Sequence, residues 1–489
     1  MTRILLCLLW AGIASAATLE ERIEAVLASS AATQRAWLGI RIVDPASGAV
    51  LYQRQADHFF TPASNAKLFS TSLALTRLGP QHRFHTRVTA DAAPDNSGRV
   101  AGDLVLEGGG DPTLSARAVP YKKGPTTGNP LAAMEELANQ VVGRGVRRID
   151  GDVVGDDRAW PWEPSPEGWS EDDAVWEYGA PGSALTLTDN TITVTVRGGR
   201  REGDPATVAL RPPIEIFTID NRLRTVAGEL PSLHLERRPG SYELRLWGTL
   251  APNRAAEPQR LAVPDPALFA AHALYEALTR RGVTIAGRPL ARHRYRNQDP
   301  PPAAELARAV VLAERDSAPL LEILRITNKV SQNLFAEIVL RETARVRRGD
   351  ASREAALKEL SQFLEEAGID AGDYQFEDGS GLSPLTLVTP AAVTRLLSYM
   401  YRSEHRDAWI SLLPVGGEDG TLSERFRASP DGRRVQAKTG TLSHASSLSG
   451  YLETRHGRTL AFSILANGYR TSSYGIRDVI DRICLAAIE

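Results

Sequence analysis

The pattern of helix-forming and strand-forming segments changes twice along the 489 residues of the chain, and this change constrains the fold more than any other feature. Residues 86–302 consist largely of short β-like runs broken by Gly and Pro, whereas helical periodicity dominates after residue 318. A Pro-rich seam at residues 297–302 has the composition of a domain junction. The length also exceeds what one hydrophobic core normally supports, so we expect two or three domains.

The segments on either side of the β-like region mix helices with strands. Their hydrophobic patterns predict helices over residues 18–29, 64–79, 318–346, 353–368 and 390–402, and strands over residues 37–43, 49–52, 434–441, 447–454 and 459–467. Two further helices, over residues 131–145 and 266–282, are expected to interrupt the β-like region.

The first sixteen residues have the parts of a secretory signal peptide. A basic start is followed by an apolar run over residues 4–13 and by Ala-Ser-Ala at residues 14–16. Cleavage there would remove Cys7 and leave Cys484 alone, so we expect no intramolecular disulfide. No second long apolar segment follows. The sequence therefore predicts an exported protein, secreted or periplasmic, without a stable membrane anchor.

The charged residues exclude one class of function and show one bias. The 57 basic and 59 acidic residues leave a net charge of −2, which removes the usual electrostatic case for nucleic-acid binding. Only six of the basic residues are lysine, and the others are arginine. A lysine that persists against this bias can mark a site that arginine cannot serve.

Three short motifs carry side chains suited to acyl transfer. Ser64 and Lys67 lie three positions apart at the start of an expected helix, so the hydroxyl and the amine can touch. A desolvated, neutral lysine can serve as the base that a serine nucleophile needs. Residues 438–440 read Lys-Thr-Gly on an expected strand, where lysine can bind a carboxylate and glycine leaves room for a substrate backbone.

The third motif, Ser331-Gln332-Asn333, lies between the other two and is uninformative alone, since it could simply break or cap a helix. Ser-x-x-Lys, Ser-x-Asn and Lys-Thr-Gly in this order are, however, the combination of penicillin-binding proteins and class A β-lactamases. The chain resembles the serine D-alanyl-D-alanine carboxypeptidase/endopeptidases of the low-molecular-mass, class C penicillin-binding type. Further matching segments are residues 108–113, 378–383 and 414–417.

The spacing of the motifs distinguishes between the members of this group of enzymes. Ser64 and Ser331 are 267 positions apart, which leaves room for the large insertion known in this family and not found in a compact β-lactamase. The resemblance implies an α/β (α+β) serine penicillin-recognising fold. In this fold helices cover an antiparallel sheet, and a large β-rich insertion interrupts the catalytic domain. The catalytic domain would comprise residues 17–84 and 304–489. Residues 85–303 would form one or two inserted domains, and residues 1–16 the signal peptide.

The resemblance also implies roles for the motif residues in acylation. Ser64 would be the acyl-forming nucleophile, and Lys67 the base that takes its proton. Burial and the positive charge of Lys438 would both lower the pKa of Lys67. Ser331 would relay a proton to the leaving D-alanine, and Asn333 would position the substrate amide.

The remaining motif positions would bind the substrate. Lys438 and Thr439 would hold its terminal carboxylate, and Gly440 would leave room beside the strand. The backbone N–H groups of Ser64 and Thr441 would form the oxyanion hole. The resemblance further implies an acidic residue from the insertion that meets the free amine of diaminopimelate. Asp173 aligns best with it, although a solvated acidic loop is an equally good interpretation.

The implied enzyme is an exported DD-carboxypeptidase that cleaves D-Ala-D-Ala stem peptides and D-Ala–diaminopimelate cross-bridges of peptidoglycan and is acylated by β-lactams. We expect no cofactor and no metal, since nine scattered histidines lack cysteine partners. The alternatives are a β-lactamase, for which residues 135–139 superficially resemble a deacylation element, and a non-catalytic peptidoglycan-binding scaffold. The sequence leaves the oligomeric state open.

Overall fold

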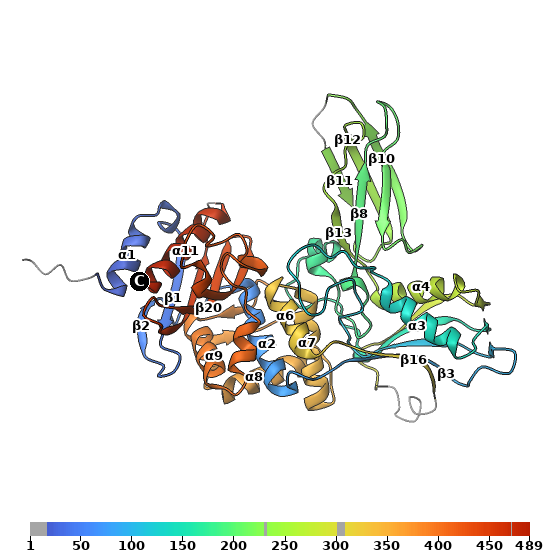
Figure 1. Ribbon diagram of the computed structural model, residues 1–489, viewed down its shortest axis with the longest axis horizontal. Coiled ribbons are helices and arrows are strands. Elements are labelled where there is room, and N and C mark those ends of the chain that lie inside the picture. Colours follow the sequence, from blue (N-terminus) through green and yellow to red (C-terminus); the bar gives the residue numbers. More distant parts are fainter. Residues whose placement is uncertain (1–16, 229–231, 301–308, 471) are drawn as a thin grey trace, which may run out of the picture.

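The computed structural model describes residues 17–228, 232–300, 309–470 and 472–489. The expected signal peptide, residues 1–16, lies outside the described residues. Within those ranges, no helix is long and apolar enough to cross a membrane. The expected architecture is confirmed: helices cover an antiparallel sheet, and a second half of the molecule is rich in strands (Figure 1).

A five-stranded antiparallel sheet forms the centre of one half of the molecule. Its strand order is β19-β20-β21-β1-β2, so the two ends of the chain meet in one sheet. The strands are β1 (Trp37–Val43), β2 (Val50–Arg54), β19 (Val435–Leu442), β20 (Ala445–Glu453) and β21 (Thr459–Asn467). Side chains of both orientations are buried along β20 and β21, because helices cover both faces of the sheet.

Alternate residues of β21 enter different cores, as the two-residue period of a strand requires. Phe462 and Ile464 pack against α1 (Leu19–Ala28) and α11 (Ser473–Ile488) on one face. Ala461 and Leu465 belong to the core on the other face. That core is formed with α2 (Lys67–Leu78), α6 (Leu320–Lys329), α7 (Asn333–Arg348), α8 (Arg353–Glu366), α9 (Pro390–Arg402) and α10 (Arg406–Ser411).

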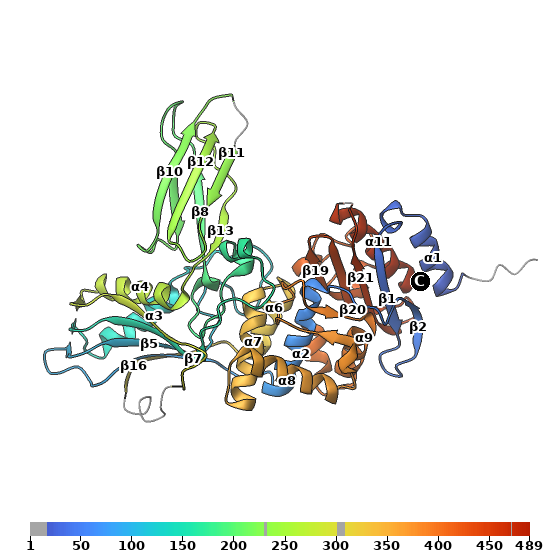
Figure 2. The same cartoon turned by 180° about the vertical axis from the view of Figure 1, so that it is seen from behind.

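Two differences from the expected elements stand out in this half. The sequence analysis assigned no element after residue 467, but α11 closes the chain against α1, as Figure 2 shows from behind. The single helix expected over residues 318–346 is divided into α6 and α7, because Ser331 adopts a left-handed backbone conformation with φ of 61°. Leucine and isoleucine continue at helical spacing across the break, so periodicity alone does not reveal it.

The other half begins with a second five-stranded sheet of order β15-β7-β5-β3-β16. Helices α3 (Ala132–Gly143) and α4 (Pro266–Thr279) pack beside it and share its core. The strands are β3 (His85–Ala90), β5 (Leu104–Gly108), β7 (Val153–Pro161), β15 (Pro289–Arg294) and β16 (Val310–Asp316), and a small neighbouring sheet consists of β4 (Arg99–Val100), β6 (Arg148–Ile149) and β14 (Thr284–Ile285). Because β16 pairs with β3, this sheet extends past the boundary expected at residue 303, and the chain returns to the first half after Asp316.

Two three-stranded sheets project from this half at the top of Figure 1. One has the order β13-β8-β9 and the other β10-β12-β11. Their strands are β8 (Thr191–Arg197), β9 (Thr207–Arg211), β10 (Thr218–Thr225), β11 (Ser232–Glu236), β12 (Glu243–Leu250) and β13 (Gln259–Ala262), and a last two-stranded ladder in the helical half pairs β17 (Tyr374–Gln375) with β18 (Leu387–Val388).

Candidate active site

The structure brings the side chains of Ser64 and Lys67 together. A short 3-10 turn, η2 (Ala63–Ala66), carries Ser64 and leads directly into α2, which begins at Lys67. The Nζ atom of Lys67 lies 2.8 Å from the Oγ atom of Ser64, within hydrogen-bond distance. A potential nucleophile and a potential base are therefore in contact before any substrate binds.

Lys67 is completely buried, and the acceptors of its hydrogen bonds among the described residues are uncharged. Its Nζ atom also donates to Asn333 Oδ1 at 2.6 Å and to the carbonyl oxygen of Ser380 at 2.7 Å. Burial lowers the pKa of Lys67 to about 7, although the buried carboxylates Asp378 and Glu337 raise it in part. The ammonium can therefore lose its proton near neutral pH, as a general base must.

Lys438 and Ser331 form a second contact beside the first. The Nζ atom of Lys438 lies 2.9 Å from Ser331 Oγ and 2.7 Å from the carbonyl oxygen of Thr439. Lys438 is also completely buried, and its pKa lies well below the usual value because of burial and the positive charge of Lys67. The left-handed conformation of Ser331 interrupts the helix and turns this hydroxyl toward Lys438.

Gly440 allows strand β19 to approach the nucleophile. A Cβ atom on Gly440 would lie 2.6 Å from the carbonyl oxygen of Pro62 and 2.9 Å from the backbone nitrogen of Ser64, closer than real contacts allow. Asn65 Nδ2 donates to the carbonyl oxygen of Lys438 at 2.9 Å, and Ser447 Oγ donates to that of Pro62 at 2.7 Å. These bonds hold β19 and its neighbour β20 beside the turn that carries Ser64.

The turn that supports Lys67, residues 378–383, received no role in the sequence analysis. Asp378 is buried and accepts six hydrogen bonds, from the backbone of Gly381, Leu382 and Ser383 and from the side chains of Ser380, Thr386 and Trp169. Glu337, one turn after Asn333 on α7, accepts the backbone N–H of Gly379 at 3.0 Å, and burial raises its pKa to about 7. The sequence shows that residues 378–383 match the family, but it does not show how many hydrogen bonds Asp378 accepts.

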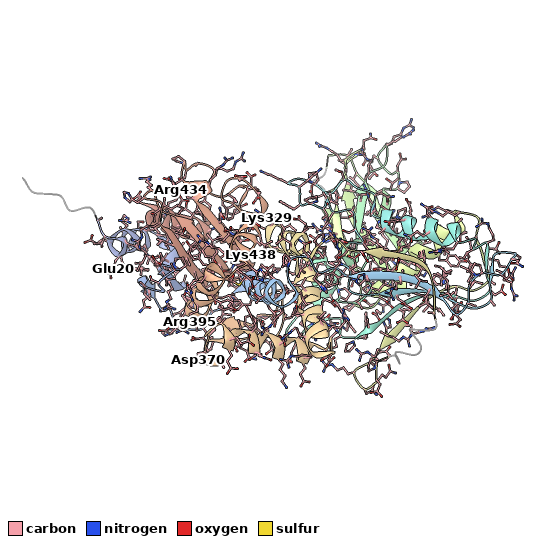
Figure 3. All side chains as sticks on the ribbon, turned by 60° about the horizontal axis from the view of Figure 1, so that its bottom comes forward. Glu20, Lys329, Asp370, Arg395, Arg434 and Lys438 are labelled. Carbon is pink, nitrogen blue, oxygen red and sulfur yellow. The ribbon has the colours of Figure 1, made fainter. Side chains whose placement is uncertain are left out.

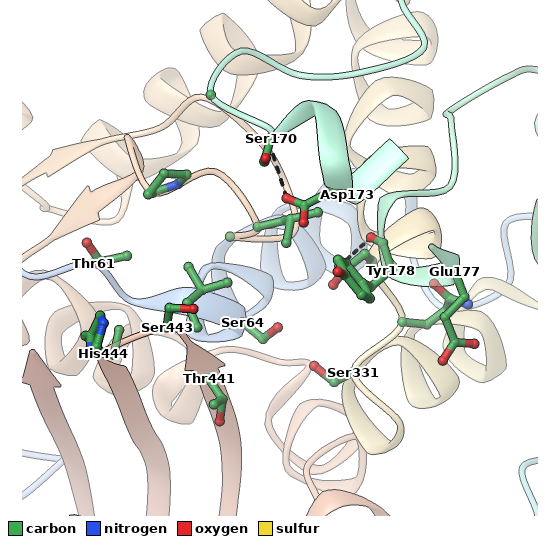
Figure 4. Close-up of a pocket in the computed structure, with 18 of the residues that line it drawn as sticks. Thr61, Ser64, Ser170, Asp173, Glu177, Tyr178, Ser331, Thr441, Ser443 and His444 are labelled. Carbon is green, nitrogen blue, oxygen red and sulfur yellow. Dashed lines mark hydrogen bonds between the residues drawn. The ribbon is translucent and has the colours of Figure 1, made fainter. Parts of the chain in front are cut away.

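The reactive groups open onto a cleft of about 1070 Å³ between the two halves of the molecule (Figure 4). The helical half contributes Ser64, Ser331, Asn333 and Thr441 to its lining. The inserted half contributes a larger share than the sequence analysis foresaw: Arg117, Gly168, Ser170, Asp172, Asp173, Glu177, Tyr178 and Arg260. Asn333 Nδ2 donates to the carbonyl oxygen of Tyr178 at 2.8 Å, which joins the two walls directly.

Asp173 lies on the wall of this cleft opposite β19. It belongs to the 3-10 turn η3 (Glu171–Val175), where its Oδ2 atom accepts the backbone N–H of Ser170 at 3.3 Å. The side chain is thereby partly used as a helix cap, yet it remains among the residues that line the cleft, as Figure 4 shows. Arg260 pairs with Glu177 at 2.6 Å on the same wall, so the wall carries charges of both signs.

The other sequence-predicted residues lie under or beside the cleft rather than on its lining. Lys67 and Lys438 are buried beneath it. Thr439 and Gly440 lie on β19 next to it, and Thr439 Oγ1 is 2.7 Å from Thr421 Oγ1. Glu135, considered as a deacylation element, lies on α3 in the inserted half and does not line the cleft. Among the residues that the structure describes, no group of three or more His, Cys, Asp or Glu side chains could hold a metal ion.

Comparison with known proteins identifies relatives along nearly the whole chain. The model of the D-Ala-D-Ala carboxypeptidase 3 (S13) family matches residues 19–487. A D-alanyl-D-alanine carboxypeptidase of Actinomadura sp. (strain R39) is 35% identical over 462 residues, which cover 92% of this chain and 81% of that protein.

Solved structures show the same fold at lower identity. The crystal structure of penicillin binding protein 4 from Haemophilus influenzae superposes with a TM-score of 0.79 at 22% identity, covering 94% of this chain and 97% of the other. The structure of that protein in complex with a β-lactam superposes with a TM-score of 0.75 at 21% identity, over the same shares of the two chains.

Proposed function

The chain belongs to the D-Ala-D-Ala carboxypeptidase 3 (S13) family of serine peptidases, and on that premise we propose that it hydrolyses D-Ala-D-Ala stem peptides of peptidoglycan through an acyl-enzyme on Ser64. The observation that carries this proposal is the 2.8 Å contact between Ser64 Oγ and the Nζ atom of a buried Lys67 whose pKa is about 7. A scaffold with a dead site would not need a deprotonatable lysine in this place.

Acylation follows from this contact. Lys67 takes the proton of Ser64 as Oγ attacks the carbonyl carbon between the two D-alanines. The backbone N–H groups of Ser64 and Thr441 stabilise the oxyanion, and the close approach of β19 supports this arrangement. The C–N bond then breaks, and the amine of the leaving D-alanine receives a proton through Ser331, whose hydroxyl Lys438 holds. Water hydrolyses the resulting ester and regenerates Ser64.

The two sides of the cleft take different parts of the substrate. Lys438 and Thr439 hold the terminal carboxylate, and Asn333 positions the amide. Asp173 meets the free amine of diaminopimelate from the opposite wall, which its place on the cleft lining supports. An amine bound there would let the same chemistry cut D-Ala–diaminopimelate cross-bridges, which is the endopeptidase reaction.

Export places the enzyme where this substrate lies. The sequence of residues 1–16 supports export to the periplasm, and the catalytic part then comprises residues 17–84 together with those after Asp316. β-Lactams acylate Ser64 in place of the peptide, because their strained amide resembles the scissile bond. The β-lactam complex of the Haemophilus influenzae protein supports this step.

A penicillin-labelling experiment tests the proposal. Wild-type protein is incubated with a fluorescent penicillin, the labelled peptide is mapped by mass spectrometry, and release of D-alanine from an acyl-D-Ala-D-Ala peptide is followed in parallel. We expect label on Ser64 and release of D-alanine, both lost in Ser64→Ala. Unlabelled wild-type protein would refute the proposal, whereas release of the label within seconds would favour a β-lactamase.

A further inference from the structure

A third buried lysine, Lys329, lies close to the site without belonging to the three motifs. Lys329 is the last residue of α6, two positions before Ser331, and it is one of only six lysines in the chain. Figure 3 labels it together with Lys438. Its Nζ atom donates to Asp419 Oδ2 at 2.6 Å and to the carbonyl oxygen of Leu413 at 2.7 Å, and its side chain is only 6% exposed.

This ion pair holds the loop after α10 against the end of α6. Asp419 Oδ1 accepts the backbone N–H of Val415 at 2.9 Å, so one carboxylate bonds both the ammonium and its own loop. The next residue, Gly420, has a φ of 54°, and a Cβ atom there would collide with the carbonyl oxygen of Lys329. The backbones of the two segments are therefore in direct contact, and the position of the short turn η7 (Gly420–Leu422) is set by Lys329.

The turn η7 presents Thr421 to strand β19. Thr421 is exposed, and its Oγ1 atom lies 2.7 Å from Oγ1 of Thr439. A hydroxyl group has one donor and two acceptor positions. In the structure Thr439 donates this bond and Thr421 accepts it. When a substrate carboxylate binds, rotation of the two hydroxyl protons would let Thr421 donate to Thr439 and Thr439 donate to the carboxylate, and the two hydrogen bonds would then strengthen each other.

We propose that Thr421 is a positioning residue for the terminal carboxylate of the substrate, which acts through Thr439 and is held in place by the Lys329–Asp419 pair. This inference rests on the proposed function, in which Thr439 binds that carboxylate. It also gives Lys329 a role, since the same ion pair fixes the helix end that precedes Ser331. Lys438, which contacts Ser331, and Thr439, which contacts Thr421, would both bind the carboxylate. The surroundings of both side chains thus depend on the buried Lys329–Asp419 pair.

The test compares two substrates that differ only in the carboxylate. Acylation rates of Ser64 are measured with an acyl-D-alanine thioester of thioglycolate and with the methyl ester of that compound, since thioesters are reactive enough for both to be followed. Thr421→Val should lower kcat/KM for the carboxylate about tenfold, the upper end of what loss of one neutral hydrogen bond costs, mainly through KM. The methyl ester should change by less than about twofold.

Three further variants make the result decisive. Thr421→Ser should restore the rate, because it keeps the hydroxyl. The double variant T421V/T439V should be no worse than T439V alone, since Thr421 acts through Thr439. Lys329→Met should lower the Tm and slow both substrates, the carboxylate more than the methyl ester, because the ion pair also fixes the helix end before Ser331. The exposed Lys358→Met should show neither effect.

Two outcomes would overturn the inference. One is an equal loss on both substrates in Thr421→Val, which would mean a general structural effect, and the other is a loss that adds to that of T439V. Wild-type penicillin labelling is measured in the same series. If wild type labels normally and Thr421→Val shows no selectivity, the inference fails while the proposed function stands; if wild type does not label, the proposed function itself fails.

Discussion

Lys67 is the residue whose chemistry depends most on its surroundings. The sequence places it three positions after Ser64, which predicts their contact from helix geometry alone. The sequence does not reveal that Asn333 and the carbonyl oxygen of Ser380 complete its surroundings, because these groups come from segments more than 250 residues away. The expected influence of Lys438 also differs: burial is the main cause of the lowered pKa of Lys67, and the repulsion between the lysines appears in the pKa of Lys438.

Replacing Lys67 by arginine tests its role as base. Lys67→Arg should slow acylation of Ser64 about 10³-fold, because a guanidinium keeps its proton at neutral pH. The rate of labelling by a fluorescent penicillin measures this effect. Lys358→Arg, on the exposed side of α8, is the matched control and should label at the wild-type rate. Retained acylation in Lys67→Arg would show that another group takes the proton.

The pH dependence of acylation should report the same group. Since burial lowers the pKa of Lys67 to about 7 and the neutral amine is the active form, the acylation rate should rise with pH through about 7. Below that pH it should fall about tenfold per pH unit. Stopped-flow measurement of acylation by a chromogenic β-lactam gives this pH dependence. A limb near pH 4 would instead point to a carboxylate as the base.

The elements that flank the site differ in how far their sequences predict them. Strands β19, β20 and β21 were expected within one or two residues of their observed bounds, although of the three only β21 carries a long apolar run. The apolar spacing continues through Ser331 and predicts one helix, whereas the polar run Ser331-Gln332-Asn333 allowed a helix break or cap, and the structure shows both: α6 ends at Lys329, and Gln332 caps α7. The break depends on tertiary contacts, among them the bond between Ser331 and Lys438 from a distant strand.

The approach of β19 to the turn of Ser64 can be tested at Gly440. Gly440→Ala should reduce acylation at least about 10²-fold, because the added methyl group would push the strand away from Pro62 and Ser64 and misplace an oxyanion donor. Gly143→Ala, near the end of α3, is the control, since a Cβ atom there meets nothing within 4 Å. Penicillin labelling and Tm should both be normal in that control, and a normal rate in Gly440→Ala would contradict the close approach.

The turn of residues 378–383 should depend on the buried Asp378. Asp378→Asn replaces a carboxylate that accepts six hydrogen bonds by an amide that cannot accept them all, so unfolding should become easier by about 3 kcal/mol. Urea denaturation measures this change. Asp370→Asn, on an exposed 3-10 turn of the same half, should stay within about 0.5 kcal/mol of wild type. A similar loss of stability in both variants would show that the hydrogen bonds to Asp378 do not stabilise the fold more than an exposed carboxylate does.

At the scale of the whole molecule, the cleft exists only because the inserted half packs against the helical half. Asn333 bonds to the backbone of Tyr178, and Trp169 donates to Asp378 at 3.0 Å, so residues of the insertion reach the supports of the nucleophile. The insertion is thus part of the site. Its sequence, which consists of short strands broken by Gly and Pro, indicates a β-rich unit but not where that unit docks.

The role of Asp173 belongs to this scale, because it faces Ser64 from the other half. Asp173→Ala should lower kcat/KM about tenfold for peptides with a free diaminopimelate amine and leave the acetylated peptides nearly unchanged, as loss of a charged hydrogen bond predicts. Digestion of purified sacculi, with analysis of the released products, extends the test to cross-bridges. Glu171→Ala, two positions earlier on the same turn and outside the cleft lining, is the control. Equal losses on both peptides would show that Asp173 does not bind the diaminopimelate amine and belongs to a solvated acidic loop.

The sequence by itself determined the class of fold, and it identified the candidate reactive groups and their order. Local spacing sets the Ser64–Lys67 contact, and apolar patterns set the strands, since both depend on neighbours in the chain. Only the tertiary structure decided the neighbours of each charge: which acceptors surround Lys67, which carboxylate pairs with Lys329 and which wall faces Ser64. Burial and contacts between distant segments control these properties, and neither is encoded in the spacing of a motif.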